Sequence, residues 1–125
     1  NASLLTEEEN KAFGFTHEEI GKALACKWKF PDYLATVIGN HHGEETGSEA
    51  ARLLCHINRI SEWLCFSLNI GYCDFSKAHA DLLAQSRDAL ELSTEDIDWV
   101  AGRMHQEIEA LSSIGWFSDY RLRVA

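Results

Sequence analysis

The chain has 125 residues, of which 46% are hydrophobic, 10% aromatic and 25% charged, with a single proline. This composition is typical of one folded domain and excludes a disordered chain or two independent cores. Its 20 acidic and 11 basic residues give a formal net charge of −9, which disfavours nucleic acid and anionic membranes as partners.

A capping box predicts where the first well-defined helix begins. Thr16 and Glu19 have the S/T-x-x-E spacing in which each side chain satisfies a backbone N–H of the other residue. The acidic segment 6–12 precedes this start. The helix should run to about Lys29, because Pro31 disfavours helical geometry in the residue before it.

Pro31 also marks the beginning of a second helix, since proline fits the first helical position. This helix should end at His41-His42-Gly43, where two histidines can interact favourably with the helix dipole and a glycine follows. Adjacent residues on a regular helix point about 100° apart, so His41 and His42 would not easily share one ion.

Three further helices are expected in the second half of the chain. The longest runs from Ser48 to about Asn69, with apolar residues three or four positions apart. Ser76 can cap the next helix, and Ser93 with Asp96 begins the last one. The pattern requires no strand in these segments, so we expect an all-α fold, a helical bundle of about five to six helices.

The two ends of the chain stand apart from this pattern. Asn1 and Ala2 resemble the remnant of a cleaved affinity tag and are left out of the functional reasoning. Residues 116–125 are expected to form a tail, either extended or a frayed helix end. No apolar run approaches the roughly 20 residues that span a bilayer, and no leader opens the chain, so we expect a cytoplasmic protein without membrane contact.

The cysteines and tryptophans carry no recognisable motif. Without a C-x-x-C pair, the cysteines are expected to be buried, reduced and inert, with a disulfide or ligand role as the alternative. The tryptophans are expected to be core or interface anchors, because no basic residues cluster around them. These residues are Cys26, Cys55, Cys65, Cys73, Trp28, Trp63, Trp99 and Trp116.

His17, His41 and His42 are the candidate metal ligands. If the first two helices pack antiparallel, His17 at the start of one approaches the pair at the end of the other, and two or three nitrogen ligands come within reach of one ion. The acids Glu18, Glu19, Glu44 and Glu45 could add a carboxylate, although Glu18 and Glu19 also suit a helix start. The other histidines, His56 beside Cys55, His79 and His105, are expected to be structural.

The order of several motifs resembles the HDOD family, the HD-related output domain of bacterial signalling proteins. The resemblance covers most of residues 7–115 and is carried by Glu9-x-x-x-Phe13-Gly14, Thr16-His17-Glu18-Glu19-Ile20-Gly21, Trp28-Lys29-Phe30-Pro31 and Ile38-x-x-His41-His42. It implies that residues 1–125 form a single HD-domain-like helical domain or the C-terminal part of one.

The wider HD superfamily contains metal-dependent phosphohydrolases, including the HD-GYP cyclic-di-GMP phosphodiesterases. Those enzymes hold metals with histidines, a His-Asp doublet and a later aspartate. His17, His41 and His42 match three of the histidines, but no histidine in this chain is followed by aspartate. Asn58 stands where the later aspartate is expected, and an amide oxygen is a weaker ligand for a transition metal.

The resemblance therefore implies a non-catalytic regulatory module, not an enzyme, with no cofactor and with a vestigial metal site at His17, His41 and His42. The first alternative is a phosphohydrolase that binds a divalent metal with further ligands from outside this chain. The second is a metal or redox sensor that uses these histidines and a cysteine. Helices that precede this region in the family are absent, so we expect uncovered apolar surface, self-association, and contacts with protein partners or regulatory domains of a longer chain.

Overall fold

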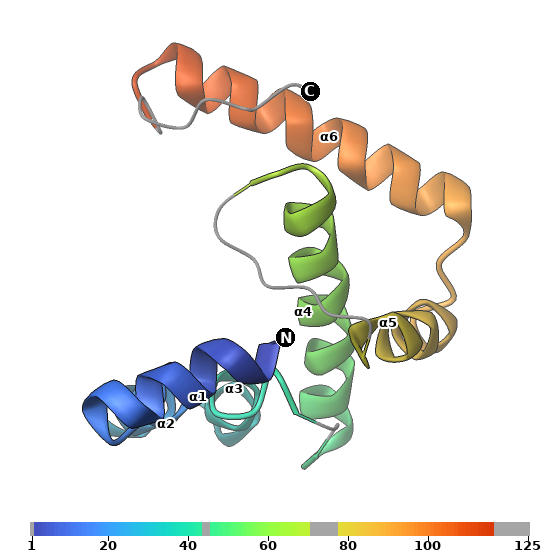
Figure 1. Ribbon diagram of the computed structural model, residues 1–125. Helices are drawn as coiled ribbons and strands as arrows, with labels where there is room; N and C mark the ends of the chain where they lie inside the picture. Colours follow the sequence, from blue (N-terminus) through green and yellow to red (C-terminus); the bar gives the residue numbers. More distant parts are fainter. Residues whose placement is uncertain (1, 44–45, 71–77, 117–125) are drawn as a thin grey trace.

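Helices account for most of what the structure, a computed structural model, describes: residues 2–43, 46–70 and 78–116. The elements are α1 (Ala2–Phe13), α2 (His17–Lys27), α3 (Asp32–Ile38), α4 (Glu49–Ser67), α5 (Ala78–Ala89) and α6 (Thr94–Ser113) (Figure 1). The described ranges contain no strand, which confirms the predicted all-α fold. None of these six helices combines the length and the apolar character that a membrane span requires.

Side-chain caps fix the beginnings of three helices where they were predicted. At α2, the Thr16 N–H donates to Glu19 Oε2 over 2.8 Å, and the Glu19 N–H donates to Thr16 Oγ1 over 3.3 Å. Ser93 and Asp96 form the same reciprocal box at α6, and the Ser48 hydroxyl oxygen caps α4. Each cap satisfies backbone N–H groups that the first turn of a helix leaves without a partner.

The end of α3 differs from the prediction. The helix ends at Ile38, with Gly39 as its C-cap, and the two histidines lie in the turn that follows. A continued helix would pair the Ile38 carbonyl with the N–H of His42. Instead that carbonyl accepts from His41 Nδ1 over 3.0 Å, and the His42 N–H donates to Glu18 Oε1 over 3.1 Å. These two bonds replace the last helical one, so the helix stops early.

The central helix is α4, which contacts α3 on one side and α5 on the other (Figure 1). Ile60 and Leu64 lie four residues apart on one face of α4 and form a buried cluster with Ile97 of α6. This cluster joins the last three helices to each other. Partly buried side chains pack around it, namely Trp63, Leu83, Leu90, Leu92, Val100, Ala101 and Met104.

The cysteines differ in burial. Cys55 is buried, as predicted, and Cys65 is partly buried, where burial raises the pKa of its thiol. Cys26 is exposed, so the prediction of a buried thiol was wrong there. Its neighbour Ala25 takes the buried position on α2, and a helix turns the next residue about 100° away.

The tryptophans are less buried than a core role requires. Trp28, Trp99 and Trp116 are 63%, 68% and 63% exposed, so of the two predicted roles, core or interface anchor, these three residues do not have the first. Trp63 packs against the core cluster as predicted. The predictions for Cys73, the cap at Ser76 and the tail beyond Trp116 lie outside the described residues.

Candidate functional site

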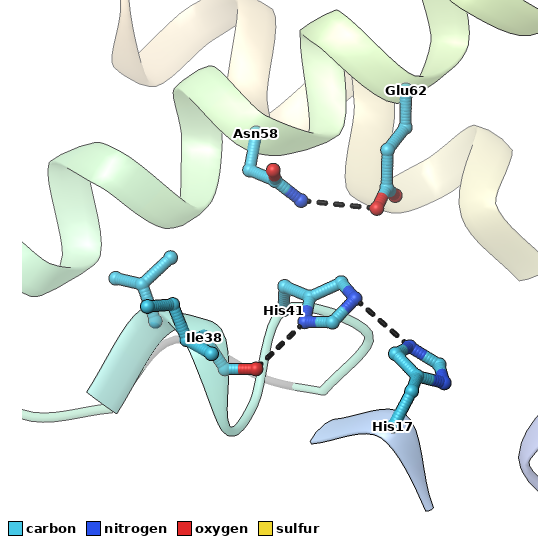
Figure 2. Close-up of a pocket in the computed structure, with 6 residues that line it drawn as sticks. His17, Ile38, His41, Asn58 and Glu62 are labelled. Carbon is cyan, nitrogen blue, oxygen red and sulfur yellow. Dashed lines mark hydrogen bonds between the residues drawn. The ribbon is translucent and has the colours of Figure 1, made fainter. Parts of the chain in front are cut away.

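The three candidate metal ligands converge. The Nε2 atom of His17 lies 3.2 Å from Nε2 of His41 and 3.1 Å from Nε2 of His42, and ligand atoms of all three rings lie within 4.8 Å of one another. All three side chains are partly buried. Figure 2 shows His17 reaching toward His41 from the start of α2. The sequence therefore predicted which histidines meet.

The packing of α2 against α3 produces this convergence. The two helices are in contact, and His17 begins one while the pair follows the other. Gly21 permits the close approach, because a Cβ at this position would lie 2.7 Å from Ile38 Cγ2. Since His41 and His42 lie in a turn, the helical angle between adjacent residues does not separate them. Their ring centroids are 4.1 Å apart, and each lies 5.1 Å from the centroid of His17.

The hydrogen-bond partners of Nδ1 in His17 and His41 show which nitrogen of each ring carries a hydrogen. His17 Nδ1 lies 2.7 Å from Glu9 Oε2, which also accepts from the His17 backbone N–H over 3.0 Å. His41 Nδ1 lies 3.0 Å from the Ile38 carbonyl. An ionised carboxylate and a carbonyl only accept, so Nδ1 carries the hydrogen in both rings. Each ring therefore directs its Nε2 atom toward the centre of the cluster and leaves that atom available to a metal ion.

Carboxyl groups adjoin the histidine cluster. The two hydrogen bonds from His17 lower the pKa of Glu9, so this carboxyl group is ionised near neutrality. Burial, followed by the charge of His41, lowers the pKa of His42 and keeps its ring neutral. Glu18 Oε1 lies 3.6 Å from His41 Nδ1. Among the described residues, no lysine or arginine forms an ion pair with Glu9 or Glu18.

The donor set fits one divalent transition-metal ion. Zinc–nitrogen bonds of about 2.0–2.1 Å place two tetrahedral ligands about 3.3–3.4 Å apart, close to the separations of 3.2 and 3.1 Å between the Nε2 atoms. The Nε2 atoms of His17 and His41 are also within hydrogen-bond distance of each other, so a single ion between them can replace that hydrogen. Metal-ligating histidines also typically donate their other N–H to a carboxylate or carbonyl, as His17 and His41 do here.

The opposite wall of the site is formed by α4 (Figure 2). Asn58 takes the place where the family resemblance leads one to expect an aspartate, and its Nδ2 donates to Glu62 Oε1 over 3.0 Å. An open pocket of about 320 Å³ separates this wall from the histidines. Its lining residues are His17, Val37, Ile38, His41, Asn58 and Glu62.

Glu9 and Glu62 are the site residues that the sequence reasoning did not identify. Glu62 could have been found from its position, since it lies one helical turn after Asn58 and shares its face of α4. Glu9 lies on the preceding helix, eight positions before His17, and its role became visible only through its bonds to His17. Of the acids that were considered, Glu18 lies at the site, Glu19 completes the capping box, and Glu44 and Glu45 lie outside the described residues.

The other histidines stay away from this cluster. His56 Nδ1 lies 3.1 Å from the hydroxyl of Ser86, which is fully buried and donates to the Leu82 carbonyl. This pair links α4 to α5 and has a structural role, as predicted for His56. His105 pairs with Glu109 on α6 over 3.3 Å. The side chain of His79 lies outside the described residues.

Comparison with protein families finds a match at the beginning of the chain. Residues 1–44 match the family model of the HDOD domain, a range that contains His17, His41 and His42. No curated protein and no solved structure matches the chain.

Proposed function

We propose that the chain, in which residues 1–44 match the HDOD domain, is a non-catalytic regulatory module of signalling proteins related to the HD superfamily and that it acts through protein–protein contacts. In this proposal the module is part of a bacterial cytoplasmic signal-transduction protein, and partner proteins or neighbouring regulatory domains bind to it. The observation that carries this proposal is the apolar face of α2.

This face is a row of large apolar side chains along one side of α2. Ile20, Leu24 and Trp28 follow one another at intervals of four residues, so they share a side of the helix. They are 41%, 40% and 63% exposed. A contiguous exposed apolar patch of this kind is typical of a protein interaction site. We call these three residues the α2 face.

Aromatic pairs extend the α2 face at both ends. The rings of Phe13 and Phe15 stack with centroids 6.1 Å apart near the beginning of α2. The rings of Trp28 and Phe30 lie 6.2 Å apart at its other end. All four rings are at least 44% exposed. Aromatic side chains are enriched in interface cores, because they bury a large area at a small cost in conformational entropy.

The metal ligands that are missing from this sequence argue against catalysis by this chain. Phosphohydrolases of the HD superfamily use a His-Asp doublet, which the sequence lacks. At position 58 an asparagine replaces the expected aspartate, and its amide donates a hydrogen bond to Glu62 Oε1. Three imidazoles can hold one ion, but they supply no anionic ligands for a two-metal centre.

The alternative function is that of a metal-dependent phosphohydrolase similar to the cyclic-di-GMP phosphodiesterases. The convergence of His17, His41 and His42 favours it, because these three rings could hold a divalent ion. Such an ion would supply Lewis acidity toward a phosphate oxygen. This chain would contribute Glu9 to orient His17, and the remaining ligands would come from elsewhere.

Sedimentation equilibrium tests the proposed role of the α2 face. We expect the chain to self-associate as its concentration rises, and Leu24→Glu to shift the equilibrium toward monomer because it places a charge in the centre of the face. Asp98→Glu on α6 is the control, since it alters an exposed residue far from α2 and should leave the association unchanged. A chain that stays monomeric, or a Leu24→Glu variant that associates as the wild type does, would remove the support for this interface.

A further inference from the structure

Glu62 is a partly buried carboxylate whose charge has no cationic partner. In the described part of the chain its hydrogen-bond partner is the amide of Asn58, and no lysine or arginine lies within ion-pair distance. It lines one side of the pocket, and His17 and His41 line the other side (Figure 2). A buried carboxylate is normally paired with a cation or coordinates a metal.

We propose that Glu62 supplies the fourth ligand of a mononuclear divalent-metal site whose other ligands are the Nε2 atoms of His17, His41 and His42. The missing aspartate on α4 is thereby replaced by a carboxylate one helical turn further along the helix. Three nitrogen ligands and one carboxylate suit Zn²⁺ and similar ions. Binding of this ion is independent of how the α2 face is used.

The position of Glu62 on α4 explains how this replacement works. Asn58 and Glu62 are four residues apart, so both side chains project from the same face of the helix toward the pocket (Figure 2). Glutamate has one more methylene group than aspartate and three rotatable side-chain bonds. The ligand atoms that lie within 4.8 Å of one another are those of the three histidines, so Glu62, which lines the pocket, would complete the site by rotating its side chain toward them.

Asn58 is the positioning residue of this site. Its Nδ2–H donates to Glu62 Oε1 over 3.0 Å, and a carboxylate has about four lone-pair positions, so this bond leaves others for a cation. Ligating carboxylates are themselves commonly hydrogen-bonded by a neighbouring side chain, which fixes their orientation. An asparagine at position 58 is thus suited to orient a ligand even though it is a poor ligand itself.

Competition of the purified chain with a chromophoric chelator for Zn²⁺ tests the proposal. The wild type should bind one equivalent. Glu62→Gln should weaken binding by at least about tenfold, because an amide replaces the anionic ligand. Glu95→Gln makes the same change of charge on the exposed first turn of α6 and should leave the affinity unchanged. Circular dichroism of each variant verifies that it is folded.

The visible spectrum of bound Co²⁺ gives a readout that a purely structural role would not change, because its intensity follows the number and geometry of the ligands. Glu62→Gln should alter this spectrum, whereas Asn58→Ala should retain its shape and lower the affinity by a smaller factor. A wild type that binds no Zn²⁺ would overturn the proposal. So would a Glu62→Gln variant with wild-type affinity and an unchanged Co²⁺ spectrum.

Discussion

The Nε2 atom of His17 lies 3.1 Å from the Nε2 atom of His42, although the two residues are 25 positions apart in the sequence. The contact depends on three features: the close packing of α2 on α3, the early end of α3, and the hydrogen bond that orients the His17 ring. Each feature can be changed by a single substitution.

The orientation of His17 should depend on Glu9. Long-range proton–nitrogen NMR should find the His17 hydrogen on Nδ1 in the wild type, because Glu9 Oε2 accepts there over 2.7 Å. Glu9→Gln should mix the two tautomers, since the amide can donate as well as accept, and should weaken Zn²⁺ binding about 10–100-fold. Glu7→Gln, an exposed change on the same helix, is the control. A pure Nδ1–H tautomer in Glu9→Gln would contradict this assignment.

The packing of α2 on α3 should depend on Gly21. In Gly21→Ala the new Cβ would lie 2.7 Å from Ile38 Cγ2, so the helices must separate. We expect the free energy of unfolding in urea to fall by about 1–3 kcal/mol. Gly102→Ala on α6 is the matched control, because the described structure places no atom within 4 Å of its new Cβ. The free energy of unfolding of that control should rise by about 0.5–1 kcal/mol. An equal rise in Gly21→Ala would show that α2 and α3 are not tightly packed at Gly21.

These features show what the sequence could and could not predict. The capping boxes at Thr16 and Ser93 depend on residues three positions apart, so the beginnings of α2 and α6 could be read directly. The meeting of His17 with the pair also followed from antiparallel packing of two neighbouring helices. The end of α3 could not be predicted, because the bond from Glu18 that draws His42 out of the helix is a tertiary contact.

The carboxylates of the site were harder to predict for a similar reason. Glu9 reaches His17 across the break between α1 and α2, and neither periodicity nor a local motif reports such a contact. Glu62 was overlooked because the family pattern directs attention to Asn58. Burial of Cys26 was predicted wrongly, since an apolar stretch does not say which side of the helix is covered.

The core cluster should depend on Leu64. This side chain is 2% exposed and joins α4 to α6. Leu64→Ala removes buried methyl groups and leaves a cavity, so the free energy of unfolding should fall by about 2–5 kcal/mol. Leu53→Ala on the same helix, where the side chain is 48% exposed, should cost less than about 1 kcal/mol. Similar losses in the two variants would mean that Leu64 is not part of the core.

The stability of α6 should depend on pH through Asp96. Hydrogen bonds from the side chain and backbone of Ser93 lower the pKa of this carboxyl group in the folded protein. The unfolded state then binds more protons in the acidic range, so this stabilisation is present above the unfolded pKa and is lost as the pH falls through the folded one. Urea unfolding at a series of acidic pH values should show a weaker pH dependence for Asp96→Asn than for the wild type. If the free energy of unfolding changed with pH to the same extent in both proteins, this role of Asp96 would be excluded.

The absence of catalysis is the central claim, and turnover of a phosphodiester is its most direct measurement. The chain is incubated with Mn²⁺ or Zn²⁺ and either cyclic-di-GMP or a chromogenic phosphodiester, beside a His17→Ala variant that lacks one of the three converging rings. We predict the same background rate for both proteins, because one ion held by three histidines and Glu62 lacks the second metal and the His-Asp doublet. A metal-dependent rate in the wild type that is lost in His17→Ala would contradict the account and establish the phosphohydrolase instead.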